Sequence, residues 1–209
     1  MIVLGLDTCL SSCSVAVLDG ERVLASAREV MARGHQERLA PMAQQVMAQA
    51  GVAFDQLQRI AVTVGPGSFT GLRVGIAFAK GLAAALDLPT VGIGSLEALA
   101  CQAGGLVFAI VDARRGQMYV QGFEDGRTLM APDAVTAETA AARIAELSMG
   151  RPFTLVGSGA VLLADLARGA AVIAAEGADA RDVARLAMTR EPWPLKPLYL
   201  RAPDARLPA

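Results

Sequence analysis

Two aspartates occupy positions from which a carboxylate could do chemistry. Asp7 follows the apolar run Ile2–Leu6, and Asp112 follows the apolar run Leu106–Val111. A carboxylate at the end of a buried strand can hold hydrated magnesium beside a phosphate group. It can equally accept hydrogen bonds from the N–H groups of a neighbouring loop. We favour this structural interpretation, because a phosphotransferase also needs glycine-rich loops around its nucleotide, and Gly157–Gly159 is the only candidate in the second half.

Metal and nucleophile chemistry find little support in the remaining residues. The chain has one histidine, His35, and three cysteines, Cys9, Cys13 and Cys101. A structural zinc site normally needs four ligands, so we interpret Cys9 and Cys13 as small buried hydrophobic residues. No serine has the Gly-x-Ser-x-Gly surroundings of a nucleophile elbow. We expect His35 to be an exposed loop residue at the start of a helix, and we expect no catalytic residue, metal or cofactor.

The most specific stretch is the glycine-rich segment Gly65–Arg73, which follows an apolar run and opens a predicted helix. Its spacing fails the phosphate-loop pattern, since no glycine is followed by lysine at the required offset. It also departs from the Gly-x-Gly-x-x-Gly pattern of dinucleotide-binding folds. A tight strand-to-helix turn, capped by Ser68 or Thr70, explains the glycines structurally.

A further interpretation of the glycines concerns contact with another helix. Gly71 and Gly75 lie four residues apart, so they share one helix face, and Ala79 extends this row. Glycine inside a helix costs about 1 kcal/mol relative to alanine, so Gly71, Gly75 and Gly81 together indicate a compensating contact. That contact is either packing within the chain or the helix of a partner.

The positions of strands predict an internal duplication. Apolar runs predict strands at Ile2–Leu6, Ser14–Leu18 and Arg22–Ala27, and then at Leu106–Val111, Gln117–Phe123 and Arg127–Met130. Asp112 lies 105 residues after Asp7, and Gly126 of the second Asp-Gly turn lies 106 residues after Gly20 of the first. The shared order favours two copies of one βββαβα unit.

The elements between these strands complete the predicted pattern. Further strands are expected at Ile60–Val64 and Thr154–Val156, and helices at Gln36–Ala50, Ser68–Leu86, Ala137–Leu147, Val161–Ala167 and Ala180–Met188. Pro41 should kink the first helix or mark its true start. We therefore expect a two-lobed, actin-like (ribonuclease H-like) α/β fold, with lobes at residues 1–103 and 104–209. In this fold, an ATP-dependent phosphotransferase with magnesium at Asp7 and Asp112 is the alternative function.

Composition narrows the class of protein. The chain has 209 residues, of which 54% are hydrophobic and 4% aromatic, so its core must be aliphatic. The 19 basic and 20 acidic residues give a net charge of −1, which disfavours tight, independent binding of nucleic acid. No basic leader precedes Asp7, and no uninterrupted apolar run approaches the ~20 residues of a membrane span. A soluble, cytoplasmic protein is expected, and the odd number of cysteines agrees with a reducing compartment.

Several motifs together resemble the TsaB family, also known as YeaZ. The resemblance is densest from residue 1 to about 120. The motifs are Leu6-Asp7-Thr8, Cys13-Ser14-Val15-Ala16, Gly34-His35, Gly65-Pro66-Gly67-Ser68-Phe69-Thr70-Gly71-Leu72-Arg73, Ala79-Lys80-Gly81-Leu82, Ser95-Leu96-Glu97-Ala98-Leu99-Ala100, Asp112-Ala113-Arg114-Arg115 and Pro197-Leu198-Tyr199-Leu200-Arg201.

The resemblance implies a non-catalytic scaffold in the threonylcarbamoylation of a tRNA adenosine. Its implied partners are the catalytic subunit TsaD and the ATPase TsaE, with a homodimer when TsaD is absent and only indirect contact with tRNA. TsaD is a metalloprotein with two histidines four residues apart on a helix, a pair that His35 alone cannot supply. Partner binding is implied on the helices of the first lobe, at Leu39, Met42, Val46, Met47, Gly71, Val74, Gly75 and Phe78.

Overall fold

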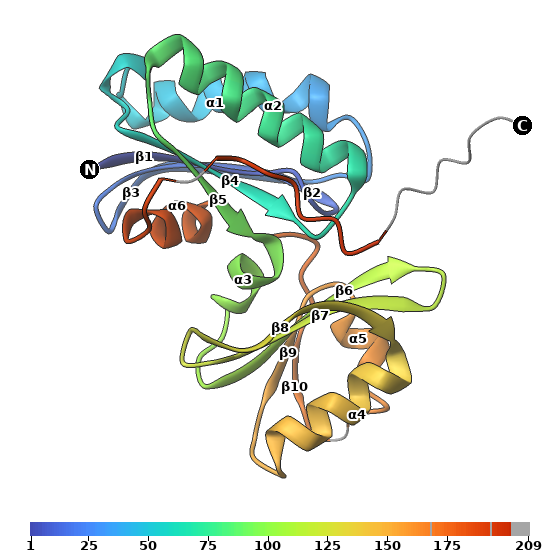
Figure 1. The fold of residues 1–209 in the computed structure, drawn as a ribbon. Helices are drawn as coiled ribbons and strands as arrows, with labels where there is room; N and C mark the ends of the chain where they lie inside the picture. Colours follow the sequence, from blue (N-terminus) through green and yellow to red (C-terminus); the bar gives the residue numbers. More distant parts are fainter. Residues whose placement is uncertain (168, 193, 202–209) are drawn as a thin grey trace, which may run out of the picture.

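The computed structural model describes residues 1–167, 169–192 and 194–201, and it consists of two five-stranded sheets with helices around them (Figure 1). The strands of the first sheet are β1 (Ile2–Asp7), β2 (Ser12–Asp19), β3 (Arg22–Val30), β4 (Arg59–Gly65) and β5 (Thr90–Gly94). Those of the second are β6 (Leu106–Arg114), β7 (Gln117–Glu124), β8 (Arg127–Thr136), β9 (Thr154–Val156) and β10 (Ala171–Ile173). The helices are α1 (His35–Ala50), α2 (Phe69–Leu86), α3 (Ser95–Ala100), α4 (Ala137–Ser148), α5 (Ala160–Leu163) and α6 (Ala180–Met188), with a 3₁₀ turn at Phe54–Gln56.

The two sheets share one topology, which confirms the predicted two-lobed fold and its duplication. The first has the order β3-β2-β1-β4-β5, and the second has the corresponding order β8-β7-β6-β9-β10. In each, the first strand is central, antiparallel to the second strand and parallel to the fourth. Each lobe carries one more strand and one more helix than the expected βββαβα unit, so the repeated unit is βββαβαβα.

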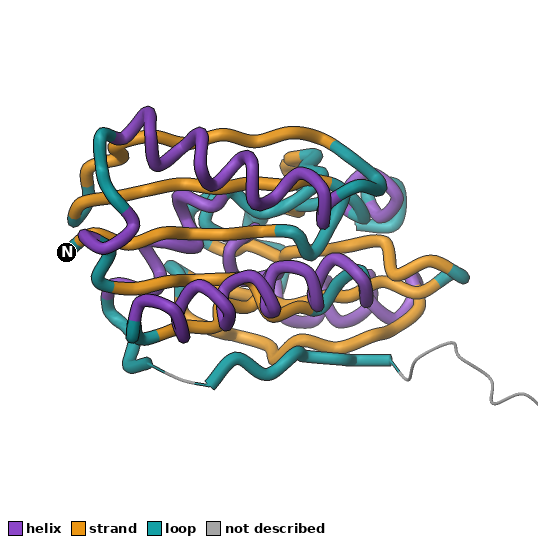
Figure 2. The backbone as a smooth tube through the Cα atoms, turned by 90° about the horizontal axis from the view of Figure 1, so that it is seen from above, coloured by secondary structure: helices purple, strands orange, loops and turns teal. Residues whose placement is uncertain are grey.

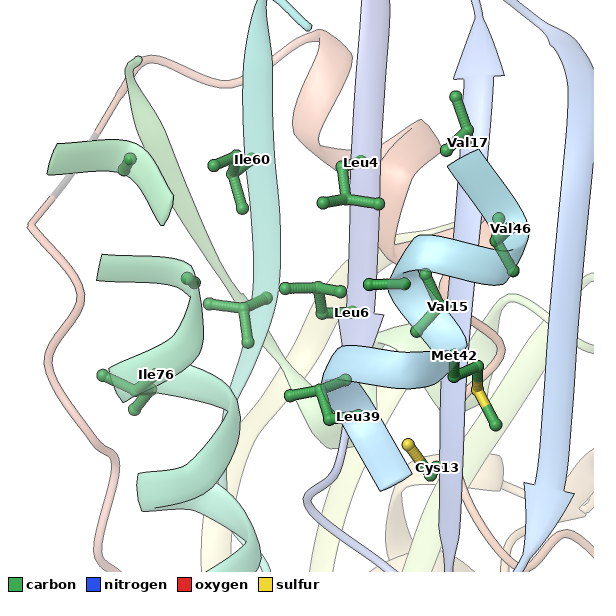
Figure 3. Packing of buried hydrophobic residues seen from close by; sticks show 14 of the residues in the cluster. Leu4, Leu6, Cys13, Val15, Val17, Leu39, Met42, Val46, Ile60 and Ile76 are labelled. Atoms are coloured by element: carbon green, nitrogen blue, oxygen red, sulfur yellow. The ribbon is translucent and has the colours of Figure 1, made fainter. Parts of the chain in front are cut away.

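Alternating side chains explain why helices cover both faces of the first sheet. Leu4 and Leu6 of β1 pack with α1 and α2 on one face of the sheet. Val3 points to the opposite face and packs with α6. Successive strand residues point to opposite faces, so a strand apolar at every position must be buried on both sides. Figure 3 shows the α1 and α2 side chains lying over β1, β2 and β4. Seen from above, the two helices run along the strands (Figure 2).

The last helix of each repeat packs in the other lobe. Helix α3 follows the first sheet, yet Leu96 and Leu99 pack against Val107 and Phe123 of the second sheet. Helix α6 follows the second sheet, yet it joins the core of the first. The expected C-terminal lobe of residues 104–209 therefore needs a correction, because Ala178–Ala187 pack in the first lobe and the Leu198 N–H donates to the Val64 carbonyl oxygen of β4.

The element boundaries depart from expectation mainly where segments are short. Strands β5 and β10 and helix α3 were not predicted, β8 extends to Thr136, and α5 ends at Leu163 rather than at residue 167. Pro41 lies inside α1, which begins at His35, so proline does not mark the start of this helix. Among the described residues, α2 is the one helix long and apolar enough to span a bilayer, but its Leu72 and Ile76 lie in the core.

The glycines of α2 are required by close packing within the chain. The Thr8 hydroxyl donates a hydrogen bond of 2.8 Å to the Gly71 carbonyl oxygen. A Cβ atom at Gly71 would collide with the Thr8 carbonyl oxygen, and one at Gly75 would lie 2.5 Å from the Thr8 hydroxyl. Helix α2 therefore lies directly on the loop after β1. Gly81 differs, since a Cβ atom there meets nothing within 4 Å.

Alanine substitutions at Gly71 and Gly81 should have opposite effects on stability. Gly71→Ala forces α2 away from Thr8, so we expect the free energy of unfolding to fall by about 2 kcal/mol. Gly81→Ala lowers the backbone entropy of the unfolded chain, and the helix has open space for the added methyl group. We therefore expect the free energy of unfolding to rise by about 0.5–1 kcal/mol. Urea unfolding of both variants measures the difference. Equal effects would contradict the packing described for Gly71.

Candidate functional site

A cleft of about 430 Å³ separates the two lobes at the ends of their central strands. The first lobe contributes the loop after β1, the start of α1 and the turn before α2, and the second contributes the end of β6. The polar lining includes Ser11, His35, Ser68, Asp112, Arg114, Tyr119, Ser158 and Glu176. Asp7 does not line the cleft, whereas Asp112 does, so the two aspartates do not face one common ligand space.

Asp7 joins three segments of the chain inside the first lobe. One carboxylate oxygen accepts hydrogen bonds from the Thr63 hydroxyl at 2.6 Å and from the Cys9 N–H at 3.1 Å. The other accepts from the Ala178 N–H at 3.2 Å. Nearby, the Ser14 hydroxyl accepts from the Ala180 N–H at 3.0 Å. Asp7 is thus a buried acceptor that holds β4 and the returning segment before α6.

Burial raises the pKa of the Asp7 carboxyl above its ordinary value of 3.8, although its three hydrogen bonds oppose this shift. Burial also raises the pKa of the Cys9 thiol, with the Asp7 charge as a smaller cause. The Cys9 Sγ donates to the Thr63 hydroxyl at 2.9 Å. The Cys9 thiol is therefore buried and hydrogen-bonded inside the first lobe.

Asp112 occupies a different environment from Asp7. Its carboxylate accepts from the Arg114 N–H at 2.7 Å, and a second oxygen lies 3.4 Å from the Arg114 guanidinium. The glycines of the Gly157–Gly159 loop are explained by packing, because a Cβ atom at Gly157 would collide with the Ile110 carbonyl oxygen. This loop therefore serves the fit of β9 and α5 against β6.

The structure corrects the expectation for His35. It is the first residue of α1 and is buried, with its Nε2 donating to the Leu10 carbonyl oxygen at 3.1 Å. Cys9 and Cys13 are buried, as expected. Among the described residues, no group of three or more histidine, cysteine, aspartate or glutamate side chains could hold a metal ion.

Two kinds of comparison place the chain among known proteins. A model of the family described as TsaD, tRNA N6-adenosine threonylcarbamoyltransferase, matches residues 24–191. A Pseudomonas aeruginosa structure described as similar to the peptidase YeaZ matches with a TM-score of 0.83 and 31% identity, over 96% of this chain and 99% of that chain. YeaZ from the same organism matches with a TM-score of 0.78 and 32% identity, over 90% of each chain.

Sequence relatives agree with these structures. The TsaB protein of Haemophilus influenzae is 40% identical over 57% of this chain and 52% of its own length. An uncharacterized protein of Mycobacterium bovis is 36% identical over 91% of this chain and 83% of its own length. The chain belongs to the TsaB (YeaZ) family. The match spans about half the length of the Haemophilus TsaB protein.

More distant structures share the fold of this TsaB-family chain. A Thermus thermophilus ROK hexokinase matches with a TM-score of 0.53 at 15% identity, over 90% of this chain and 98% of that chain. An ADPNP-bound dehydratase activator from Clostridium difficile matches with a TM-score of 0.55 at 13% identity, over 90% of this chain and 94% of that chain. At these identities the likeness shows the actin-like fold alone.

The structure places most of the expected TsaB-family partner residues in the core. Six of the eight are buried within this chain, because they pack on the sheet or on Thr8: Leu39, Met42, Val46, Met47, Gly71 and Gly75. Val74 and Phe78 are only partly buried, at the edge of the same core. An apolar stripe on a helix shows which face of the helix is buried. In this structure, the first sheet of the same chain buries that face.

Sequence reasoning missed the residues that complete the Asp7 site. Thr63 is a polar residue inside the apolar strand β4, and a lone hydroxyl in a buried strand is a signal for a specific hydrogen bond. Ala178 and Ala180 contribute backbone N–H groups, which carry no signal in the residue type. They are identified only in the structure, where the segment before α6 packs against the end of β1 and the start of β2.

The raised pKa of Asp7 predicts a pH dependence of stability. The folded state binds this proton more tightly than the unfolded state, so stability contributed by Asp7 is present below about pH 4 and lost as the pH rises through the folded pKa. Wild-type protein should therefore lose stability relative to Asp7→Asn as the pH rises from about 4. Urea unfolding of both proteins between pH 4 and 8 measures this trend. A difference independent of pH would refute it.

Proposed function

We propose that this chain is a non-catalytic scaffold in the biosynthesis of threonylcarbamoyladenosine in tRNA. It would pair with TsaD, with TsaE joining the complex, and support modification of the adenosine next to the anticodon in tRNAs that read codons beginning with A. The names of the TsaB relatives support the pathway. The observation that carries the scaffold role is the outer face of α2, where the exposed residues Ala77, Gly81, Ala84 and Ala85 are small and uncharged.

We define the α1–α2 surface as the outward residues of these two neighbouring helices. Its exposed small residues are Ala40, Ala48, Ala77, Gly81, Ala84 and Ala85, and Val74 and Phe78 add partly buried apolar area. On α2, Lys80 brings charge to this surface, whereas Arg73 lies at the start of the helix against the Phe69 ring and the Tyr199 hydroxyl. Small side chains let another helix approach closely, and the edges of Val74 and Phe78 would supply apolar contact. The same surface would serve a homodimer when TsaD is absent.

The residues around the cleft support a scaffold rather than an enzyme. Asp7, one of the two carboxylates expected to hold magnesium in a phosphotransferase, is buried and already accepts three hydrogen bonds. Magnesium retains several of its waters when bound, which calls for a carboxylate open to the cleft. The single histidine of the chain lines the cleft, but it is largely buried and its Nε2 donates to the Leu10 carbonyl oxygen. These features agree with a subunit that acts in the cytoplasm by supporting TsaD.

ATP hydrolysis by the pure chain separates the scaffold from a phosphotransferase. A scaffold should show no turnover above a buffer control, and Asp112→Asn should change nothing. Turnover that Asp112→Asn abolishes would establish the enzyme and refute the scaffold. Asp112 is the better target for this assay, because it lines the cleft whereas Asp7 is part of the core.

A charge placed on the α1–α2 surface should weaken pairing with TsaD. Ala77 is exposed on α2, so Ala77→Glu should leave the fold intact while burying an unpaired carboxylate in the complex. We expect at least about a tenfold loss of affinity, or about 1.4 kcal/mol, measured by titration with purified TsaD. The matched control is Ala142→Glu on α4 of the second lobe, which should bind as wild type. Equal affinity of both variants would refute the surface assignment.

In the modification assay, TsaD and TsaE are incubated with tRNA, with and without this chain. The wild-type chain should raise the yield of threonylcarbamoyladenosine, and Ala77→Glu should require a higher concentration to do so. No dependence on the chain would refute the proposed function itself.

A further inference from the structure

An extended segment of residues 195–201 crosses from the first lobe to the second. Leu195 is buried in the first core, and the Leu198 N–H donates to the Val64 carbonyl oxygen at 2.7 Å. At its far end, the Arg201 guanidinium donates to the Ala113 carbonyl oxygen at 2.7 Å. The segment runs as an extended stretch past α2 in Figure 2. It thereby brings the start of α2 and the loop after β6 to one edge of the cleft.

Two exposed aromatic rings and an arginine meet where this segment passes α2. The rings of Phe69 and Tyr199 lie 5.5 Å apart, and they remain 41% and 39% exposed. The Arg73 guanidinium lies 3.7 Å above the centre of the Phe69 ring, and its Nε donates to the Tyr199 hydroxyl at 3.2 Å. These contacts fix the guanidinium plane at the surface instead of leaving a mobile side chain.

Two further arginines project from the loop that Arg201 contacts. Arg114 and Arg115 are consecutive, exposed, and both have positive φ, at 64° and 56°. The side chain of Arg114 is 82% exposed although it lies near Asp112. Arg73 is thus linked to the segment through Tyr199, and Arg201 of the same segment contacts Ala113, which directly precedes Arg114 and Arg115. The chain has a net charge of −1, so this local gathering of positive charge is not a consequence of composition.

We propose that this edge contacts the phosphate backbone of the tRNA bound to the assembled complex. The surface, called the arginine edge, consists of Arg73, Arg114, Arg115 and Arg201 with the rings of Phe69 and Tyr199. This proposal rests on the proposed function, and it replaces the expectation that the chain reaches tRNA only indirectly. Guanidinium groups match the geometry of phosphate oxygens, and exposed aromatic rings can stack on unpaired bases.

The surrounding charges favour contact along the edge instead of entry into the cleft. Asp112 and Glu176 line the cleft, so a phosphate inside it would face carboxylates. Of the arginine edge, Arg114 is the member among the cleft-lining residues, and its side chain is 82% exposed. A few arginines give weak binding by the chain alone and a useful contribution once TsaD holds the tRNA, because linked contacts act at high effective concentration.

The test uses the complex of this chain with TsaD and TsaE and an unmodified tRNA substrate. The double variant Arg114→Gln/Arg115→Gln removes two charges at an exposed loop. We expect tRNA affinity to fall roughly threefold to tenfold, and the slope of log K against log salt to decrease by about 1 for each lost phosphate contact. Arg114→Lys/Arg115→Lys should restore the slope, because lysine keeps the charge.

The matched control removes two exposed arginines from hairpins at other places. Arg22 and Arg127 each follow an Asp-Gly turn, and Arg127 lies at the opposite end of β7 from the 114–116 loop. Arg22→Gln/Arg127→Gln should keep the wild-type tRNA affinity and salt slope. An equal loss in this control would show a general charge effect and overturn the proposal.

Pairing with TsaD is measured for every variant, so failure of this proposal differs from failure of the proposed function. Normal pairing with unchanged tRNA affinity and salt slope would overturn the arginine edge while leaving the scaffold role intact. Lost pairing with unchanged tRNA affinity of the remaining complex would assign the edge to a protein partner, which also overturns it.

If the wild-type chain does not bind TsaD, tRNA titration of the pure chain at low salt decides. Tighter binding by wild type than by the glutamine variant supports the edge, and equal binding overturns it.

Discussion

The two lobes depend on the hydrogen bonds that converge on Asp7. Its carboxylate links β1 to β4 through Thr63, and it binds the Ala178 N–H just before α6. Helix α6 follows the second sheet in the chain. This hydrogen bond therefore holds the returning segment against the first lobe. Gly177 fits here because a Cβ atom would collide with Ser12. A carboxylate in the position of a magnesium ligand therefore serves as the acceptor at the centre of the fold.

The exchange of helices makes the lobes one structural unit. Helix α3 covers the inner face of the second sheet, and α6 covers the inner face of the first. Each sheet thus depends on a helix from the other repeat for one of its faces, since β1 is buried from Val3 to Asp7 and β6 from Leu106 to Val111. Separating the chain near residue 103 would expose both inner faces. Duplication of sequence therefore does not imply two independent domains.

The sequence predicted the central strands well because each is a nearly uninterrupted apolar run with a turn at its end. It did not reveal β5, whose residues Thr90–Gly94 include two glycines, or β10, which has three residues. It also could not say which surface covers the stripe of α1, since periodicity identifies a buried face without naming its neighbour. Asp7 was predicted at the end of its strand, but its partner Ala178 is 171 residues away.

The glycine signature that identifies the family is explained by the backbone. Gly65 lies against the Leu198 carbonyl, Gly67 against the Cys9 carbonyl and Gly71 against the Thr8 carbonyl, so a side chain at any of them would meet main-chain oxygen. The Ser68 N–H donates to the Cys9 carbonyl at 2.7 Å, which locks the same turn. The motif therefore positions α2 and the segment after α6. The opposite side of α2 carries the exposed small residues Ala77, Gly81, Ala84 and Ala85.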